Sequence, residues 1–475
     1  MLTTLAAPAF ADIWHIENGD ITISAGESGN NVTQNNNTTY GDTNTIITNQ
    51  NKDKASSHTV TIETNDKNDK VEVTLKDVNI DTSSRNKAAV SVTGSGNTTI
   101  KLDGDNALKS DIYRSGIYGS GSLTISGGEN DSLTAQGGSG ANGISSSGSL
   151  TISGGTVTAN GGNGTISGGN GIYSDSGDVT ISGGSTVTAK GGDGGSFGGG
   201  SGISSFNRVA ISGSTVTATG GDSKDGSGGN GIYSSSGVAI SGGAVTANGG
   251  DSKDGSGGNG IYSSSSVAIS GGTVNATGGD STGSDGGGGN GIYSRNGSID
   301  LSGSLELTAK AGSPNGKALS QNGKELNLDT IKDKLGPGAK VTATDANGET
   351  KQVSVPRPVE PEESSSSSDD GSAAPSAPVS SLPGLTVTDK DGQRISYTST
   401  QSGNTLTVCV GRLTASLRIS LAALRQMRAE GIETITFQTI LCSTTLSVDE
   451  LLAMGGEDAE AVLTHRFTDS SLTVD

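Results

Sequence analysis

A tyrosine follows a Gly-Ile pair at five places in the chain, and a serine takes the same position at two more. The tyrosines are Tyr118, Tyr173, Tyr233, Tyr262 and Tyr293, and the serines are Ser145 and Ser204. The isoleucines of these tripeptides are 27 to 31 residues apart. A phenol combines an apolar ring with a hydroxyl that forms hydrogen bonds. Regularly repeated phenols can therefore bind a ligand that repeats at a similar interval, such as a linear polysaccharide.

The expected carbohydrate-binding residues are four of these tyrosines, which lie in the more regular repeats: Tyr173, Tyr233, Tyr262 and Tyr293. Three of the four come from consecutive repeats, so a regular fold would place them in a line. Stacked tyrosines also stabilise a sheet without binding any ligand. The spacing fits both roles.

A second row of chemically active residues is acidic. Its members follow a Gly-Gly pair at intervals of 29 residues: Asp193, Asp222, Asp251 and Asp280. Like charges stacked in neighbouring repeats repel one another unless they are neutralised. Calcium, which takes six to eight oxygen ligands, is a candidate cofactor here. The alternative is a solvated loop in which Lys224 and Lys253 supply the opposite charge.

Two polar rows have simpler explanations. Asparagines precede most of the Gly-Ile pairs, at Asn142, Asn170, Asn230, Asn259 and Asn290. Asparagine at a turn satisfies backbone groups and tolerates left-handed geometry, which predicts a structural role. Paired threonines recur in Thr-Val-Thr at 156–158, 186–188 and 215–217. A flat threonine array could bind ice, but β-branched residues are also good strand formers, and strand formation is the favoured explanation.

No residue pattern predicts catalysis. The three histidines, His15, His58 and His465, are scattered along the chain. A polysaccharide lyase would need a base, for which Lys190, Arg208 and Arg295 are candidates. None of the three is paired with carboxylates at a recognisable spacing, and a hydrolase would need two carboxylates on either side of the bond. We therefore expect a protein that is not an enzyme, with a lyase-like enzyme as the alternative.

The repeat itself predicts the elements that position these rows. A fixed period near 30 residues is typical of a solenoid. Within the unit 231–250, five apolar residues alternate with a period of two, which indicates strands: Ile232, Val238, Ile240, Val245 and Ala247. These side chains should face the core, and the residue after each Gly-Ile should point outward. The predicted fold is all-β, a right-handed parallel β-helix of about ten coils.

Composition limits the possible partners. The chain has 475 residues, of which 78 are glycine, and a net charge of -19. An acidic chain without a basic stripe excludes nucleic acid as a partner. No run of about 20 apolar residues is present, so we expect no transmembrane segment. An acidic, soluble rod outside the cell and a monomeric state fit this composition.

The expected domain organisation has four parts. Residues 1–11 end in Ala9-Phe10-Ala11 and resemble the remnant of a signal peptide. Residues 12–355 form the β-helix, and residues 356–384, rich in proline, serine and acidic side chains, form a disordered linker. Residues 385–475 form a small α+β domain of unknown role, which contains both cysteines, Cys409 and Cys442. An exported protein could join them in a disulfide, and two free thiols are equally compatible with the sequence.

The segments 71–81, 88–92, 99–108 and 116–135 resemble a bacterial β-helix carbohydrate-binding domain family. The resemblance covers about residues 13–320, and the family occurs on secreted and cell-surface proteins of Firmicutes. It implies a right-handed parallel β-helix similar to that of pectate lyases. It also implies an association with calcium and the binding of plant cell-wall polysaccharides without their cleavage.

The sequence thus predicts a secreted or cell-surface protein with a non-catalytic, polysaccharide-binding or adhesive β-helix. Two alternatives stay open. One is the lyase-like enzyme, and the other is a structural surface spacer that presents the C-terminal domain.

Overall fold

The computed structural model describes residues 12–356 and most of residues 384–474, with gaps at 390–391, 396, 403, 411–413, 440–442, 455–458 and 466–469. The expected signal-peptide remnant, residues 357–383 of the expected linker and Cys442 lie outside the described residues. The chain divides into two compact units, Met1–Val359 and Glu360–Asp475. Each unit is described by itself.

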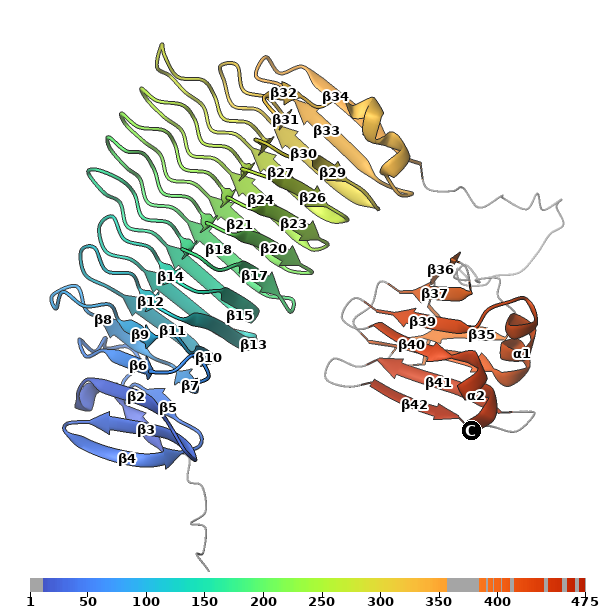
Figure 1. The fold of residues 1–475 in the computed structure, drawn as a ribbon, viewed down its shortest axis with the longest axis horizontal. Coiled ribbons are helices and arrows are strands. Elements are labelled where there is room, and N and C mark those ends of the chain that lie inside the picture. The colour runs from blue at the N-terminus through green and yellow to red at the C-terminus, as the bar shows by residue number, and fades with distance from the viewer. Residues whose placement is uncertain are drawn as a thin grey trace, which may run out of the picture. The chain divides into compact units, whose positions relative to one another are not determined.

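The first unit is a parallel β-solenoid of about 13 turns, which confirms the predicted fold class and corrects the predicted ten coils (Figure 1). The additional turns are irregular ones before residue 116 and after residue 312, where the repeat is too degenerate to count in the sequence. A typical turn has three short strands and one long loop, so the strands of successive turns form three parallel rows. The right-handed winding stays a prediction.

The first row contains the Gly-Ile tripeptides and belongs to a 14-stranded sheet. Its strands are β2 (Ile21–Gly26), β6 (Val60–Thr64), β9 (Val90–Gly94), β12 (Ile117–Gly119), β14 (Ile144–Ser146), β16 (Ile172–Ser174), β19 (Ile203–Ser205), β22 (Ile232–Ser234), β25 (Ile261–Ser263), β28 (Ile292–Ser294) and β31 (Leu319–Gln321). Three strands continue this sheet antiparallel at its ends: β3 (Gly29–Gln34), β4 (Asn37–Asp42) and β32 (Lys324–Glu325).

The second and third rows form a 20-stranded sheet. The second row comprises β1 (Ile13–His15), β5 (Ile46–Thr48), β7 (Lys70–Lys76), β10 (Asn97–Asp103), β17 (Val179–Ser182), β20 (Arg208–Ser212), β23 (Gly237–Ser241), β26 (Ser266–Ile269) and β29 (Ile299–Leu301). The third row comprises β8 (Asn79–Asp81), β11 (Asp105–Lys109), β18 (Thr186–Lys190), β21 (Thr215–Thr219), β24 (Ala244–Asn248), β27 (Gly272–Thr277), β30 (Leu305–Lys310) and β33 (Lys340–Thr344). The long strands β13 (Ser122–Gln136) and β15 (Leu150–Asn160) run through both rows.

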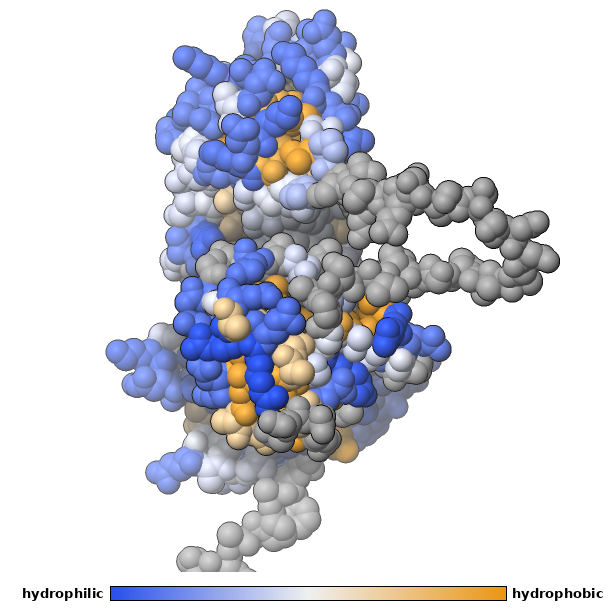
Figure 2. Space-filling model, turned by 90° about the vertical axis from the view of Figure 1, so that its right-hand side faces the viewer, coloured by the Kyte–Doolittle hydropathy of each residue, from blue (hydrophilic) through white to orange (hydrophobic). Residues whose placement is uncertain are grey.

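A thin apolar column fills the solenoid. Ile232, Val238, Ile240, Val245 and Ala247 are at most 2% exposed, as predicted from their alternation. Identical residues lie directly above one another, for example Ile232 on Ile261 and Val245 on Val274. Because these few residues form the core, the low apolar content does not prevent folding. In Figure 2, which draws both units, hydrophilic residues cover most of the coloured surface that faces the viewer.

The glycine-rich loops stack as regularly as the strands. Gly258 N–H donates to the Gly250 carbonyl within one loop, and Gly250 N–H donates to the Gly229 carbonyl of the preceding loop, each at 2.8 Å. A Cβ on Gly258 would lie 1.8 Å from the Gly229 carbonyl oxygen, so the backbones are too close for any side chain. Glycine is thus required here for close approach rather than for a left-handed φ.

Both ends of the solenoid are closed. At the N-terminal end, the antiparallel strands β3 and β4 cover the sheet edge, and Trp14 donates a hydrogen bond to Asp42 at 3.1 Å. A short 3-10 helix, η1 (Ile16–Asn18), lies beside them. At the C-terminal end, β34 (Thr350–Ser354) pairs antiparallel with β33, and the 3-10 helix η2 (Leu328–Lys334) buries Leu328 and Ile331. Covered edges do not pair with other chains.

The described residues of the second unit form two four-stranded sheets and two helices. One sheet contains β35 (Leu385–Thr388), β38 (Ala415–Ser420), β41 (Glu460–His465) and β42 (Ser470–Val474). The other contains β36 (Thr398–Ser402), β37 (Thr405–Cys409), β39 (Thr434–Gln438) and β40 (Ser443–Ser447). The helices α1 (Leu421–Ala429) and α2 (Val448–Met454) begin after Ser420 and Ser447, whose hydroxyls accept from the N–H groups of Ala423 and Glu450. Cys409 is a free thiol in contact with Gln438.

Candidate functional site

The predicted binding tyrosines lie in one line along the outer face of the 14-stranded sheet. In the register of the first row, Ser145 pairs with Tyr173, Tyr173 with Ser204, and Ser204 with Tyr233. Tyr233 pairs with Tyr262, and Tyr262 with Tyr293. The isoleucine before each of these residues is buried in the core, which turns the next side chain outward.

Phe206 fills the gap that Ser204 leaves in this line. Its ring centroid lies 6.1 Å from that of Tyr173 and 6.2 Å from that of Tyr233. The centroids of Tyr233 and Tyr262 are 5.2 Å apart, and those of Tyr262 and Tyr293 are 5.4 Å apart. Five rings on consecutive coils therefore form one continuous aromatic row, comprising Tyr173, Phe206, Tyr233, Tyr262 and Tyr293. We did not predict Phe206; its signal was an aromatic residue two positions after the serine that replaces tyrosine.

The rings do not all face the same way. Tyr233 and Tyr262 are stacked with an interplanar angle of 7°, so each covers one face of the other. Phe206 is turned by 87° from Tyr173, and Tyr293 by 80° from Tyr262. The tyrosines of the row are half-buried, whereas Phe206 is 53% exposed. A ligand along the row would thus meet ring edges and hydroxyls at Tyr233 and Tyr262 rather than exposed ring faces.

Hydrogen bonds orient the phenols. The Tyr173 hydroxyl donates to Asp175 at 2.8 Å. Burial raises the pKa of Tyr173, and this bond raises it further, to about 12. The Tyr233 hydroxyl contacts the Ser235 hydroxyl at 3.2 Å. Arg295 lies beside Tyr262, and this neighbour raises the pKa of the exposed arginine. The row therefore offers phenol hydroxyls and one cation to a ligand.

The asparagine row satisfies backbone groups, which is the first of the two reasons given for its predicted structural role. Each side-chain oxygen accepts from the backbone N–H of the next coil, for example Asn230 Oδ1 from Asn259 N–H at 3.0 Å. Asn259 Nδ2 donates to the same oxygen at 2.9 Å. None of the five asparagines has a left-handed φ, so the predicted tolerance of that geometry is not used.

The aspartate row has the same architecture. Asp193 Oδ1 accepts from Asp222 N–H at 3.1 Å, Asp222 Oδ1 from Asp251 N–H at 2.8 Å, and Asp251 Oδ1 from Asp280 N–H at 2.7 Å. All four carboxylates are exposed. In the part of the chain that the structure describes, Lys224 and Lys253 form no ion pair, so the backbone N–H groups provide the stabilising contact. Within the same residues, no group of three or more His, Cys, Asp or Glu side chains is arranged to hold a metal ion.

The threonines form two outward-facing rows on the strands of the third row. Thr156, Thr186 and Thr215 pair in one row, and Thr158 pairs with Thr188 in the other. The first row continues to Ala244, and the second ends its run of threonines at Asn275. The arrangement is that of ordinary strand positions facing solvent.

The candidate catalytic bases lie at three different places on the coil. Lys190 ends a third-row strand, Arg208 begins a second-row strand, and Arg295 follows a first-row strand. The fold therefore does not bring them together.

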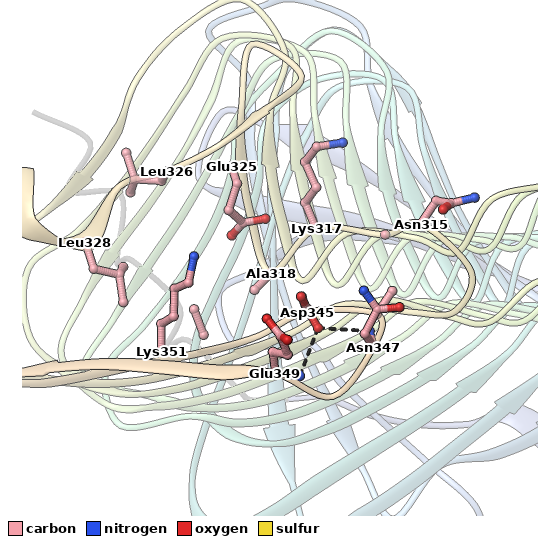
Figure 3. A pocket seen from close by; sticks show the side chains of 13 residues that line it. Asn315, Lys317, Ala318, Glu325, Leu326, Leu328, Asp345, Asn347, Glu349 and Lys351 are labelled. Carbon is pink, nitrogen blue, oxygen red and sulfur yellow. Dashed lines mark hydrogen bonds between the residues drawn. The ribbon is translucent and has the colours of Figure 1, made fainter.

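Carboxylates do gather in a pocket of about 480 Å³ at the C-terminal end of the solenoid (Figure 3). Burial raises the pKa of Glu325, and its Oε1 accepts from Leu319 N–H at 2.9 Å. Asp345 Oδ1 accepts from the N–H groups of Asn347 and Glu349 at 2.9 Å each. Glu325 and Asp345 thus accept from backbone N–H groups at the end of the solenoid, where no further coil provides acceptors. Their contacts indicate a structural role in the end cap.

No protein-family model, curated protein or solved structure matches the chain. Among the described residues, no helix is long and apolar enough to span a membrane. The arguments for a function therefore rest on the geometry of the solenoid.

Proposed function

We propose that the solenoid is a non-catalytic module that binds a linear polysaccharide along the aromatic row. The supporting observation is that the row is continuous over five coils only because Phe206 replaces the missing tyrosine. A phenylalanine that is 53% exposed contributes little to the core, whereas exposed aromatic rings are enriched where proteins bind partners.

The row suits a polymer rather than a single sugar. Successive coils are about 4.8 Å apart, so five rings extend over about 19 Å. Phe206 and Tyr293, which are turned relative to their neighbours, would supply ring faces, and Tyr233 and Tyr262 would supply hydroxyls. Arg295 adds a charged donor beside Tyr262. Secretion or display at the cell surface, as the sequence predicts, would give the module access to such a polymer.

The test is retention of the full chain on insoluble cellulose, xylan, mannan and pectin. We expect the double variant Tyr233→Ala/Tyr262→Ala to lose tenfold or more in retention. It should stay folded with a modest fall in unfolding temperature, because the two rings stack on each other but lie outside the core. The matched control is Tyr40→Ala, which removes a tyrosine that is 77% exposed and remote from the row. Equal retention of wild type and double variant would contradict the proposal.

Two further measurements separate the alternatives. Release of unsaturated or reducing ends from the polymer would indicate an enzyme. Calcium between neighbouring aspartates stays a prediction, since each carboxylate keeps one oxygen free of the N–H contact. Repeating the retention assay with calcium and with a chelator tests that prediction.

A further inference from the structure

A groove of about 610 Å³ continues the aromatic row toward the N-terminal end of the solenoid. Its floor consists of outward positions in the first row of strands: Thr61, Ser91, Tyr118 and Ser145. These four residues pair in register, and Ser145 pairs with Tyr173, the first ring of the row. The groove and the row are therefore one uninterrupted surface.

Residues from the connecting segments of two successive coils form the wall of the groove. Asn86 and Lys87 come from one coil, and Tyr113 and Arg114 come from the next. Arg114 Nε donates to Asn86 Oδ1 at 3.2 Å, which joins the two turns. Tyr113 is 74% exposed and Tyr118 is 43% exposed, so both rings are accessible.

Tyr113 has a backbone conformation that its residue type disfavours. Its φ is +60°, and the residues 27 positions before and after it, Asn86 and Gly140, have φ values of +51° and +70°. Asparagine and glycine tolerate this left-handed region, whereas a bulky side chain there is strained. Strain of this kind is found where a side chain serves a function, because a residue that fits the turn would otherwise be more stable.

The polar groups of the groove suit a hydroxyl-rich ligand. The hydroxyls of Thr61 and Ser91 have no hydrogen-bond partner among the described residues. The Lys87 ammonium is paired with Asp20 at 3.2 Å, and the same carboxylate is paired with Arg85 at 2.7 Å. Free hydroxyls, an amide and two aromatic rings are the groups that bind sugar rings.

We propose that this groove is a separate saccharide subsite, in which Tyr113 and Tyr118 hold sugar residues of the polymer that continues along the aromatic row. The proposal rests on the proposed function and extends it. The aromatic row has no side wall, whereas the groove has one, and we assign the selection between sugars to this wall. A chain that occupies the groove contacts protein from the side as well as from below, so the groove discriminates between sugars more strongly than the row does.

The decisive variant is Tyr113→Gly in the full chain. Glycine relieves the strained φ and removes the ring, so we expect an unchanged or higher unfolding temperature together with weaker binding. Calorimetric titration with cellohexaose, xylohexaose, mannohexaose and hexagalacturonate should show a loss of affinity of about fivefold or more for the hexasaccharide that binds. Tyr118→Ala should have a similar effect, and Tyr40→Ala should have none.

Each outcome assigns the failure to one proposal. Unchanged affinity in Tyr113→Gly and Tyr118→Ala, with loss in Tyr233→Ala/Tyr262→Ala, overturns the subsite and leaves the proposed function standing. A lower unfolding temperature of Tyr113→Gly with unchanged affinity shows that the ring is structural and also overturns the subsite. If Tyr113→Gly and Tyr118→Ala lose affinity and Tyr233→Ala/Tyr262→Ala does not, the subsite is supported and binding along the aromatic row is contradicted. A wild type that binds no hexasaccharide and no polymer rejects both.

Discussion

At the scale of single residues, two rows of polar side chains accept hydrogen bonds from backbone N–H groups of the next coil. They take the place of backbone carbonyl acceptors. Asp222 and Asn230 lie near opposite ends of the same loop, between β21 and β22, and each places Oδ1 on the N–H of the next coil. The aspartate row begins with an asparagine, because Asn163 Oδ1 accepts from Asp193 N–H at 2.8 Å. An amide therefore serves in this row as well as a carboxylate, and the negative charge is not needed for the hydrogen bond.

This comparison predicts the effect of neutralising one aspartate. Asp251→Asn keeps the acceptor and removes one of several stacked charges, so the unfolding temperature in chelator should stay the same or rise slightly. Asp251→Ala removes the acceptor and should lower stability by about 1 kcal/mol. Thermal unfolding of both variants, with chelator and with calcium, checks the prediction. If calcium raises the unfolding temperature of wild type and not of Asp251→Asn, the row binds calcium and its charge has a function.

At the scale of elements, the loops are a third stacked layer beside the sheets. Their glycines bond to one another within a loop and between loops. Single bridges between Ser223, Ser252 and Ser281 keep the loops in the same register as the strands. A stacked loop layer is rigid, since the backbones on both sides prevent any side chain from entering.

The glycines of these loops should differ sharply in their tolerance of alanine. Gly258→Ala places Cβ 1.8 Å from the Gly229 carbonyl oxygen, so the loops must separate and we expect a loss of about 2 kcal/mol or more. Gly287→Ala is the matched control, because its φ is outside the left-handed region and the nearest atom, the Pro314 carbonyl oxygen, would be 3.7 Å away. Chemical denaturation of the two variants measures the difference. Equal stability of the two would show that the loops are loosely packed.

The C-terminal unit contains a repeat of its own. The pattern Ser-x-x-x-Leu-x-x-Met occurs as Ser420, Leu424 and Met427, and again as Ser447, Leu451 and Met454. In both copies a strand leads into the helix, and the helix leads into a strand of the other sheet, as β38–α1–β39 and β40–α2–β41. The unit therefore uses the same strand–helix–strand connection twice, although Met427 is buried and Met454 is exposed.

At the scale of the whole molecule, the solenoid is a one-dimensional stack in which each coil contacts mainly its neighbours. Residues 220–236 and 249–265 are identical, so a deletion of residues 237–265 removes one complete coil and leaves no altered junction. The aromatic row would lose one tyrosine, Tyr262, in the process.

We expect this 29-residue deletion to fold with an unfolding temperature close to that of wild type, and to weaken polymer retention. A deletion of residues 238–265, one residue shorter, should fold as well. It places Val267 seven positions after Ile232, which is the spacing that Ile172 and Val179 have in the native stack. Circular dichroism and the retention assay measure both effects. Full retention after the 29-residue deletion would favour a spacer over a binding surface.

The sequence by itself determined the solenoid, because the Gly-Ile tripeptides and the alternation around Ile232 and Val245 leave only one set of side chains that can form a core. It also determined which positions face outward, since the strand period is two. The helix caps Ser420 and Ser447 were predictable for a similar local reason, a side-chain oxygen placed just before an apolar helical pattern.

The tertiary structure decided what the outward rows do. Phe206 joins the aromatic row because neighbouring coils bring it between Tyr173 and Tyr233, and its own segment indicates this only by placing an aromatic residue two positions after Ser204. The aspartates looked like mutually repelling charges until the stacking placed each one on an N–H of the next coil. The strain of Tyr113 depends on a turn that the preceding and following coils impose. Contacts between coils are long-range in sequence, so only the folded stack could reveal them.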